Sequence, residues 1–181
     1  MKKSIVSGLF SLLLLSGCVS IQGVDVQGDF CPDSQQANCR EQWIVNACSA
    51  TANSYPYYRD RLLYKGYGEL FTENATFQIG DRAVIEGREA IVQALRNRGP
   101  KATSRHFSQV VNMQAVGEDA ATGISYLNLY QVDTQTLNNG DNSVGAPTFI
   151  AEYHDTFMIE NNRCLIDKRK VVIVFRGAVE K

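Results

Sequence analysis

Histidine, proline and tryptophan are scarce in this chain of 181 residues, which contains two, four and one of them. Because His106 and His154 are the only histidines, the sequence has no HExxH pair and no Cys/His zinc spacing. Residues 66–68 (GYG) lack the third glycine of a dinucleotide-binding turn, and residues 123–127 lack the closing glycine of a nucleophile elbow. We therefore expect neither a metal ion nor a nucleotide cofactor.

An excess of basic charge is also missing. Lysine and arginine total 18 against 19 aspartate and glutamate residues, and no Lys/Arg stripe occurs, so a nucleic-acid partner is not expected. Hydrophobic residues make up 44% of the chain and charged residues 20%, which is typical of a folded domain. This composition excludes a disordered chain and a multi-span membrane protein.

No apolar run reaches the roughly 20 residues that a membrane-spanning helix needs. The longest run, residues 5–15, follows two lysines and precedes small residues, a pattern that predicts a signal peptide over residues 1–17. The sequence Leu-Ser-Gly-Cys at 15–18 resembles the lipobox of bacterial lipoproteins. That resemblance implies cleavage before Cys18 and lipidation of this cysteine, with palmitate as a typical acyl chain.

A lipid on Cys18 would anchor the protein to a membrane, because each buried methylene group contributes about 0.8 kcal/mol. Val19 follows the cysteine in place of aspartate, which in the lipoprotein pattern resembles outer-membrane sorting. We expect a protein of the bacterial cell envelope at the periplasmic face of the outer membrane. The polar, glycine-containing residues 18–38 would form its lipidated start and flexible tether, followed by one domain over residues 39–181.

Four further cysteines would lie in a compartment where disulfides persist, and four cysteines allow three pairings. We favour Cys31–Cys39, which closes a short loop, and Cys48–Cys164, which ties an early helix to a late strand. Buried free thiols are the alternative.

Hydrophobic periodicity predicts helices first and strands second. The expected helices cover residues 40–61 (interrupted or kinked at Pro56), 62–71 and 89–97. A small hairpin is expected at 75–79 and 83–85, and long strands at 104–116, 120–134, 148–159 and 163–175. Two of the three junctions between these long strands are short, with a polar loop over 135–147 as the exception, so an antiparallel meander is expected. The order predicts an α+β domain whose sheet curves over the helices.

His106 and Asp60 are the candidate catalytic residues. His106 opens the first long strand and shares a face with Ser108, Val110 and Asn112, a mixed face that suits a partly wet cavity. Its ordinary pKa near 6.5 allows proton transfer at neutral pH, although a structural role is the alternative. Asp60 lies among apolar and aromatic residues, and its alternative is an exposed charge paired with a neighbouring arginine.

Six segments in order carry a resemblance to a known family: residues 55–60 (YPYYRD), 70–75 (LFTENA), 86–91 (EGREAI), 105–107 (RHF), 153–155 (YHD) and Arg169. Together they resemble the SnoaL-like branch of the nuclear transport factor 2-like superfamily, over about residues 41–177. The resemblance implies a cone, in which a bent antiparallel sheet wraps around the N-terminal helices and a pocket opens at the wide end.

In the bile acid 7α-dehydratase and scytalone dehydratase types of this branch, the site positions correspond by motif to Tyr55, Asp60, His106 and Arg169. Arg169 would be either an anchor for substrate charge or a structural partner of an acidic residue. Tyr58 and Asn112 are further candidate binding residues. His154 faces the other side of its strand, so we expect a structural role for it.

These residues predict proton transfer on a small apolar carbonyl compound, by a lyase or isomerase that dehydrates, isomerises or cyclises it. His106 would be the general base, Asp60 would orient the imidazole, and Tyr55 would donate a hydrogen bond to the ligand. The alternatives are a non-catalytic binder of a small hydrophobic ligand and an envelope interaction module. The resemblance also makes a homodimer through the outer face of the sheet an expectation.

Overall fold

Helices occupy the first part of the chain and long strands the second, in the computed structural model that describes residues 36–140 and 145–177. The helical elements are α1 (Gln36–Asp60), α2 (Tyr64–Gly68), α3 (Arg88–Arg98), the 3-10 turn η2 (Gly99–Lys101) and α4 (Thr134–Asn138). The strands are β1 (Phe71–Ile79), β2 (Ile85–Glu86), β3 (Ala102–Val116), β4 (Ala120–Asp133), β5 (Phe149–Glu160) and β6 (Arg163–Arg176). The predicted α+β class is confirmed.

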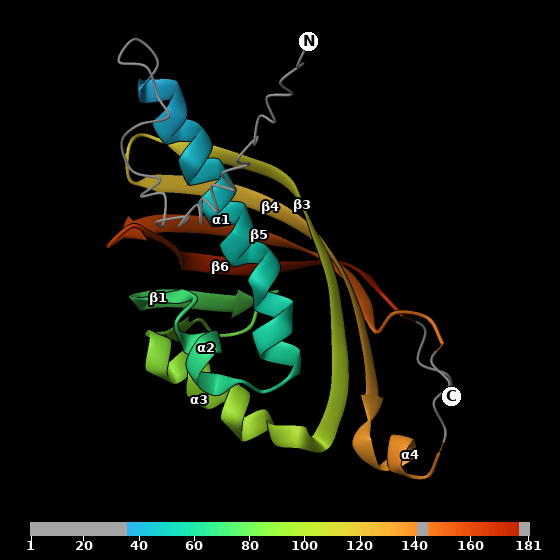
Figure 1. Cartoon of the computed structure of the whole chain (residues 1–181). Coiled ribbons are helices and arrows are strands. Elements are labelled where there is room, and N and C mark those ends of the chain that lie inside the picture. The colour runs from blue at the N-terminus through green and yellow to red at the C-terminus, as the bar shows by residue number, and fades with distance from the viewer. Residues whose placement is uncertain (1–35, 141–144, 178–181) are drawn as a thin grey trace, which may run out of the picture.

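All six strands form one sheet in the order β2-β1-β6-β5-β4-β3. Strands β3 to β6 form the expected antiparallel meander, and β1 and β2 form the expected hairpin. The sheet curves around α1, while α2 and α3 lie beside β1 (Figure 1). One face of the sheet therefore encloses α1 and the other faces outward.

The contact between α1 and the sheet follows from the spacing of its apolar residues. Ile44, Cys48, Ala52 and Tyr55 are all buried and recur every three or four residues, so they lie on one side of the helix. The helix continues through Pro56 to Asp60. The buried side of α1 thus extends to Tyr55, and the charged residues Arg59 and Asp60 follow about one turn later, at the end of the helix.

A disulfide joins this helix to the sheet. The sulfur atoms of Cys48 and Cys164 are 2.04 Å apart, which confirms the predicted pairing between an early helix and a late strand. Next to it, the hydroxyl of Thr51 donates a hydrogen bond to the carbonyl oxygen of Cys164 (2.7 Å). The predicted Cys31–Cys39 pair cannot be compared, because Cys31 lies outside the described residues.

Three features of the fold differ from the expectations. Helix α1 begins at Gln36, inside the segment predicted as a tether. Helix α4 lies at the start of the predicted loop, where the Asp133 side chain caps it by accepting a hydrogen bond from the Gln135 N–H (2.8 Å). Strand β1 pairs in parallel with β6, a contact between distant segments that local patterns do not encode. The predicted signal peptide and Cys18 lie outside the described residues.

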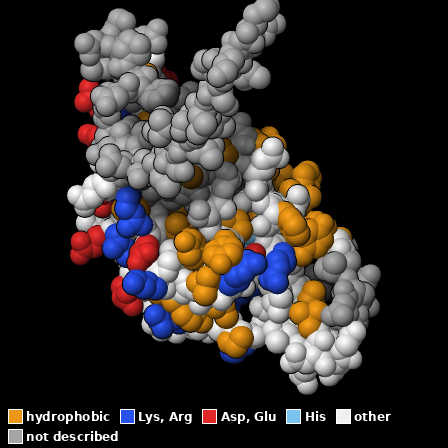
Figure 2. All heavy atoms as spheres, viewed as in Figure 1, with side chains coloured by type: hydrophobic (Ala, Val, Ile, Leu, Met, Phe, Trp, Pro, Cys, Tyr) orange, Lys and Arg blue, Asp and Glu red, His pale blue; other side chains and the backbone are white. Residues whose placement is uncertain are grey.

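Surface and hydropathy add two observations. On the face shown in Figure 2, Lys and Arg side chains are interspersed with acidic and hydrophobic ones. Across residues 36–140 and 145–177, no helix has both the length and the hydropathy needed to span a bilayer.

Candidate functional site

The end of α1 places Asp60 against the first strand of the meander. Leu62 adopts a left-handed backbone conformation (φ 54°), which stops the helix directly after Asp60. The N–H of Leu63 then bonds to the carbonyl oxygen of Tyr58 (2.9 Å), which closes the last turn. The Asp60 carboxylate consequently projects toward β3.

On β3, alternation directs Ser104 and His106 to the inner face, and both are buried. The Nδ1 atom of His106 is 2.5 Å from Oδ1 of Asp60, and the backbone N–H of His106 donates to Oδ2 (2.7 Å). The hydroxyl of Ser104 also donates to Oδ1 (3.3 Å). The structure therefore joins the two predicted catalytic residues in one hydrogen-bonded pair.

The two partners hold different charges. Burial alone would raise the pKa of Asp60, but the hydrogen bonds and charge interactions with His106 and Arg59 keep it below its ordinary value. Burial lowers the pKa of His106 to about 4, against the opposing effect of its hydrogen bond with Asp60. At neutral pH the pair consists of a carboxylate and a neutral imidazole.

The hydrogen-bond pattern also fixes the tautomer of His106. An ionised carboxylate can only accept, so Nδ1 carries the proton that His106 donates to Asp60. The lone pair then resides on Nε2. This is the arrangement that a histidine needs to accept a proton from a ligand while a carboxylate stabilises the resulting imidazolium.

Acidification should destabilise the protein through His106. In the unfolded chain this histidine takes up a proton near pH 6.5, whereas in the folded protein it stays neutral until about pH 4. The unfolded state binds more protons between these values, so the free energy of unfolding should fall by about 3 kcal/mol as pH decreases through that interval. Urea denaturation at a series of pH values measures this slope.

His106→Gln should lose this part of the slope, whereas His154→Gln, which removes the other histidine, should retain it. Equal slopes in the wild type and in His106→Gln would contradict the assignment of a buried neutral imidazole to His106.

Tyr55 lies next to the pair, inside a cage of aromatic rings. Its ring centroid is 6.3 Å from that of His106 and 5.5 Å from those of Tyr67 and Tyr153. Burial raises the pKa of Tyr67 and of Tyr153, and interactions with Tyr55 add to both effects. The two neighbouring phenols therefore remain protonated, and the proximity of Tyr55 to His106 agrees with the predicted grouping.

Arg169 forms the other side of this cage. Its guanidinium carbon is 4.1 Å from the ring centroids of both Tyr55 and Tyr153. Its Nε and Nη2 donate to the two oxygens of Asp155, at 2.8 and 2.6 Å. Both charges are buried. Of the two predicted roles for Arg169, the structure shows the partner of an acidic residue. That residue is Asp155, which was not among the predicted site residues.

A small pocket opens beside Asp60. Its volume is about 120 Å³, and it lies where the ends of α1 and α3 meet the start of β3. It is lined by Arg59, Asp60, Leu62, Arg98, Gly99, Pro100, Ala102, Thr103, Ser104 and Thr134. His106 and Tyr55 are not among these residues and lie deeper in the core. The two arginines were also not singled out from the sequence.

Two predicted binding residues lie elsewhere. The ring of Tyr58 packs so closely over Gly66 that a Cβ on this glycine would lie 2.3 Å from a ring carbon. A β-bulge at Val111 shifts the alternation of β3 by one residue, so Asn112 faces outward and does not share the face of His106. Neither residue lines the pocket beside Asp60, and the expectation that Asn112 shares the face of His106 is wrong.

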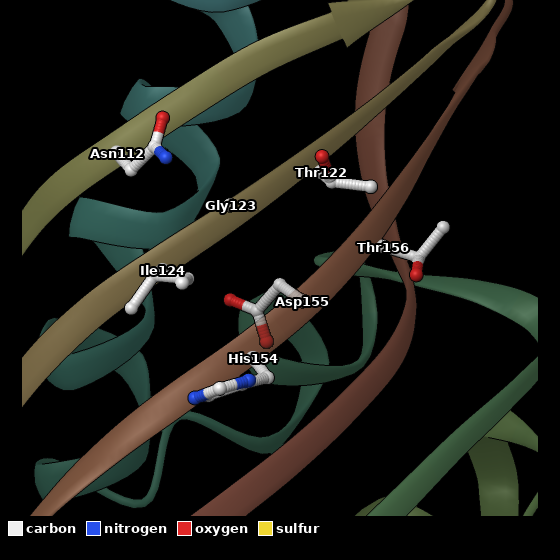
Figure 3. Close-up of a pocket in the computed structure, with 7 residues that line it drawn as sticks. All are labelled: Asn112, Thr122, Gly123, Ile124, His154, Asp155 and Thr156. Atoms are coloured by element: carbon white, nitrogen blue, oxygen red, sulfur yellow. The ribbon is translucent and has the colours of Figure 1, made fainter.

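Asn112 instead lines a hollow of about 290 Å³ on the outer face of the sheet, with α1 behind the strands (Figure 3). His154 lies in the same hollow, so its predicted orientation away from the core is correct. Its Nε2 is 2.7 Å from Oε2 of Glu152. Along residues 36–140 and 145–177, no group of three or more metal-binding side chains is found at either site.

Comparison with solved structures supports the fold. An NTF2-like protein with a cystatin-like fold from Novosphingobium aromaticivorans is 16% identical, with a TM-score of 0.66 over 83% of this chain and 95% of that one. A candidate scytalone dehydratase from the same organism is 17% identical, with a TM-score of 0.64 over 82% and 92%. A protein from Catenulispora acidiphila in complex with S-DNPA is 18% identical, with a TM-score of 0.57 over 71% and 91%.

No curated protein sequence matches the chain. The sequence model of the SnoaL-like domain does match, over residues 41–170. This range includes the Asp60–His106 pair, the aromatic cage and the buried ion pair of Arg169 with Asp155. The predicted fold and the family match thus agree, and the chain belongs to the SnoaL-like domain family, with the NTF2-like fold.

Proposed function

We propose that this SnoaL-like protein is a cofactor-independent dehydratase, isomerase or cyclase that acts by proton transfer on a small carbonyl compound. The observation that carries the proposal is the Asp60–His106 pair, with its 2.5 Å separation and neutral imidazole. Because its Nδ1–H is held by a carboxylate, the neutral His106 has a lone pair at Nε2 that can accept a proton. A pKa that is shifted by burial and by a specific charged partner is typical of functional sites. The candidate scytalone dehydratase of the same fold supports the reaction class.

In this reaction His106 Nε2 takes a proton from the carbon next to the carbonyl group. Asp60 stabilises the imidazolium that forms, because its carboxylate already accepts the Nδ1–H bond. The Tyr55 hydroxyl donates a hydrogen bond to the carbonyl oxygen, where negative charge develops. In dehydration, the proton on His106 then passes to the departing hydroxyl, so the products are water and an enone.

The proposal predicts that His106→Asn strongly lowers turnover while the protein remains folded. A positioned general base contributes on the order of 10² to 10⁴ in rate, so a loss of that size is expected. The assay follows enone absorbance for a panel of β-hydroxy ketones, and circular dichroism checks the fold. His154→Asn is the matched control and should keep full activity. Turnover that is unchanged in His106→Asn would contradict the role of His106.

A specific observation favours the second candidate, a non-catalytic binder. The pocket beside Asp60 is small, and its walls include neither His106 nor Tyr55. A binder would take up the same ligands in the wild type and in His106→Asn, with no turnover in either.

We also propose that the protein is a lipoprotein, anchored through Cys18 to the cell envelope at its periplasmic face. The proposal rests on the lipobox resemblance of residues 15–18. The Cys48–Cys164 disulfide supports it, because such bonds persist in oxidising compartments such as the bacterial periplasm. The redox state of this pair in intact cells tests the placement.

A further inference from the structure

The pocket beside Asp60 has an unbalanced charge. Among the described residues that line it, Asp60 is the only acidic one, and Arg59 and Arg98 are both present. The Asp60 carboxylate is already occupied by His106 and Ser104. One carboxylate therefore faces two guanidinium groups and is itself held by other donors.

The contacts of the two arginines differ, because Arg59 has Asp60 as an ion-pair partner and Arg98 has no carboxylate partner among the described residues. Arg59 Nη1 donates to the neutral hydroxyl of Ser104 (3.1 Å) and forms an ion pair with Asp60 Oδ1 (3.6 Å). Arg98 Nη2 donates to the neutral amide oxygen of Gln131 (2.6 Å). Among the described residues, no carboxylate forms an ion pair with Arg98. Burial lowers the pKa of Arg98, and the positive charge of Arg59 acts in the same direction, against smaller opposing effects of Tyr55 and Asp60.

We propose that this pocket binds a carboxylate group of the ligand, which Arg98 and Arg59 hold beside the Asp60–His106 pair. The inference rests on the proposed function and names its substrate class, a small carbonyl compound that carries a carboxylate. Planar guanidinium groups match the two oxygens of a carboxylate. At about 120 Å³ the pocket is close to the roughly 150 Å³ of a cavity that admits benzene. It therefore accommodates a small acid or one end of a larger one.

Such binding would also strengthen the base. Burial is the largest influence that lowers the pKa of His106, and the positive charges of Arg59 and Arg98 contribute to the same effect. A bound carboxylate offsets both charges and moves the pKa of His106 upward. Substrate binding and proton abstraction would then be coupled through the two arginines.

The test compares benzoate with benzamide, which has nearly the same shape and no charge, by calorimetric titration of the full chain at low ionic strength. Benzoate should bind and benzamide should bind on the order of tenfold more weakly, because a hydrogen bond to a charged partner is the stronger kind. Arg98→Gln should weaken benzoate binding by a similar factor and leave benzamide unchanged. Arg96→Gln is the matched control, because Arg96 lies on the same helix but stacks on Tyr64, outside the pocket.

Three results would overturn the inference: equal affinity for benzoate and benzamide, equal losses in Arg98→Gln and Arg96→Gln, or tighter binding of inorganic phosphate than of benzoate. The outcome is independent of turnover. If benzoate binds as expected while no β-hydroxy acid or ketone is converted, the carboxylate site stands and the proposed catalysis fails. If ketones are converted but benzoate does not bind, the reverse holds.

Discussion

Asp155→Asn is expected to lower the free energy of unfolding by about 3 to 5 kcal/mol, the cost of leaving a buried charge without its partner. The side chains of Asp155 and Arg169 are 1% and 0% exposed, and their two hydrogen bonds are bidentate. Nη1 of Arg169 is buried and has no hydrogen-bond partner among the described residues, so the guanidinium depends on Asp155. Removing the carboxylate charge leaves the cation between two tyrosine rings, in a region that water does not reach.

Urea denaturation measures this loss against a control within the same chain. Arg40 and Asp119 form an exposed ion pair at 3.3 Å, and Asp119→Asn should cost no more than about 1 kcal/mol. The double variant Asp155→Leu/Arg169→Met should recover much of the stability that Asp155→Asn loses, because no buried charge remains. If Asp155→Asn costs no more than Asp119→Asn, the pair does not stabilise the fold as described.

Replacing Cys48 and Cys164 with alanine should cost about 2 to 5 kcal/mol of stability. The two cysteines are 116 residues apart in sequence, so the disulfide closes a loop that contains most of the described chain. In the chain-entropy account, a disulfide that closes a long loop stabilises the folded state most, because it removes the most conformational entropy from the unfolded chain. Both cysteines are also buried, which adds a smaller packing contribution.

Denaturation in the presence and absence of reductant separates the link from the packing. The difference in stability between the wild type and the double alanine variant should shrink strongly in reductant. A difference that persists unchanged would show that the packing of the two side chains, not the covalent bond, is responsible. Blocking free thiols in intact cells before lysis then reports the compartment, since an exported chain carries the disulfide and a cytoplasmic one carries two thiols.

The four long strands were predictable because each is a long run rich in β-branched and aromatic residues between turn or loop segments. The strand predicted at 163–175, for example, is observed as Arg163–Arg176. Helix α1 likewise follows from the spacing of its apolar residues. The parallel contact between β1 and β6 could not be inferred, because it joins segments about 90 residues apart without a local signal.

The site was predictable up to the first irregularity in the sheet. His106 lies before the bulge at Val111, so alternation placed it on the inner face, whereas Asn112 lies after the bulge and was misplaced. Asp155 was missed for a related reason. Continuing the pairing from Glu160 and Arg163 would place it opposite Lys168, but a register shift after Phe157 moves it opposite Arg169.

Arg98 depends on tertiary structure entirely. It occupies the last turn of α3, where basic residues are common on any helix, and only the folding of η2 and β3 around it forms a pocket with Asp60. The charge of Arg98 at the end of α3 therefore does not by itself predict a ligand site, because the pocket depends on the neighbouring strand β3.

If the protein is anchored through Cys18 as proposed, the position of the disulfide has a mechanical consequence. Tension applied to the start of α1 reaches Cys48 first, and the covalent bond to Cys164 passes the load into β6 at the centre of the sheet. The last 12 residues of the helix, about 18 Å at 1.5 Å per residue, lie beyond this junction and end at Asp60. Tension at the anchor would thus be transmitted to the sheet, and the end of α1 that carries the Asp60 carboxylate would not be under tension.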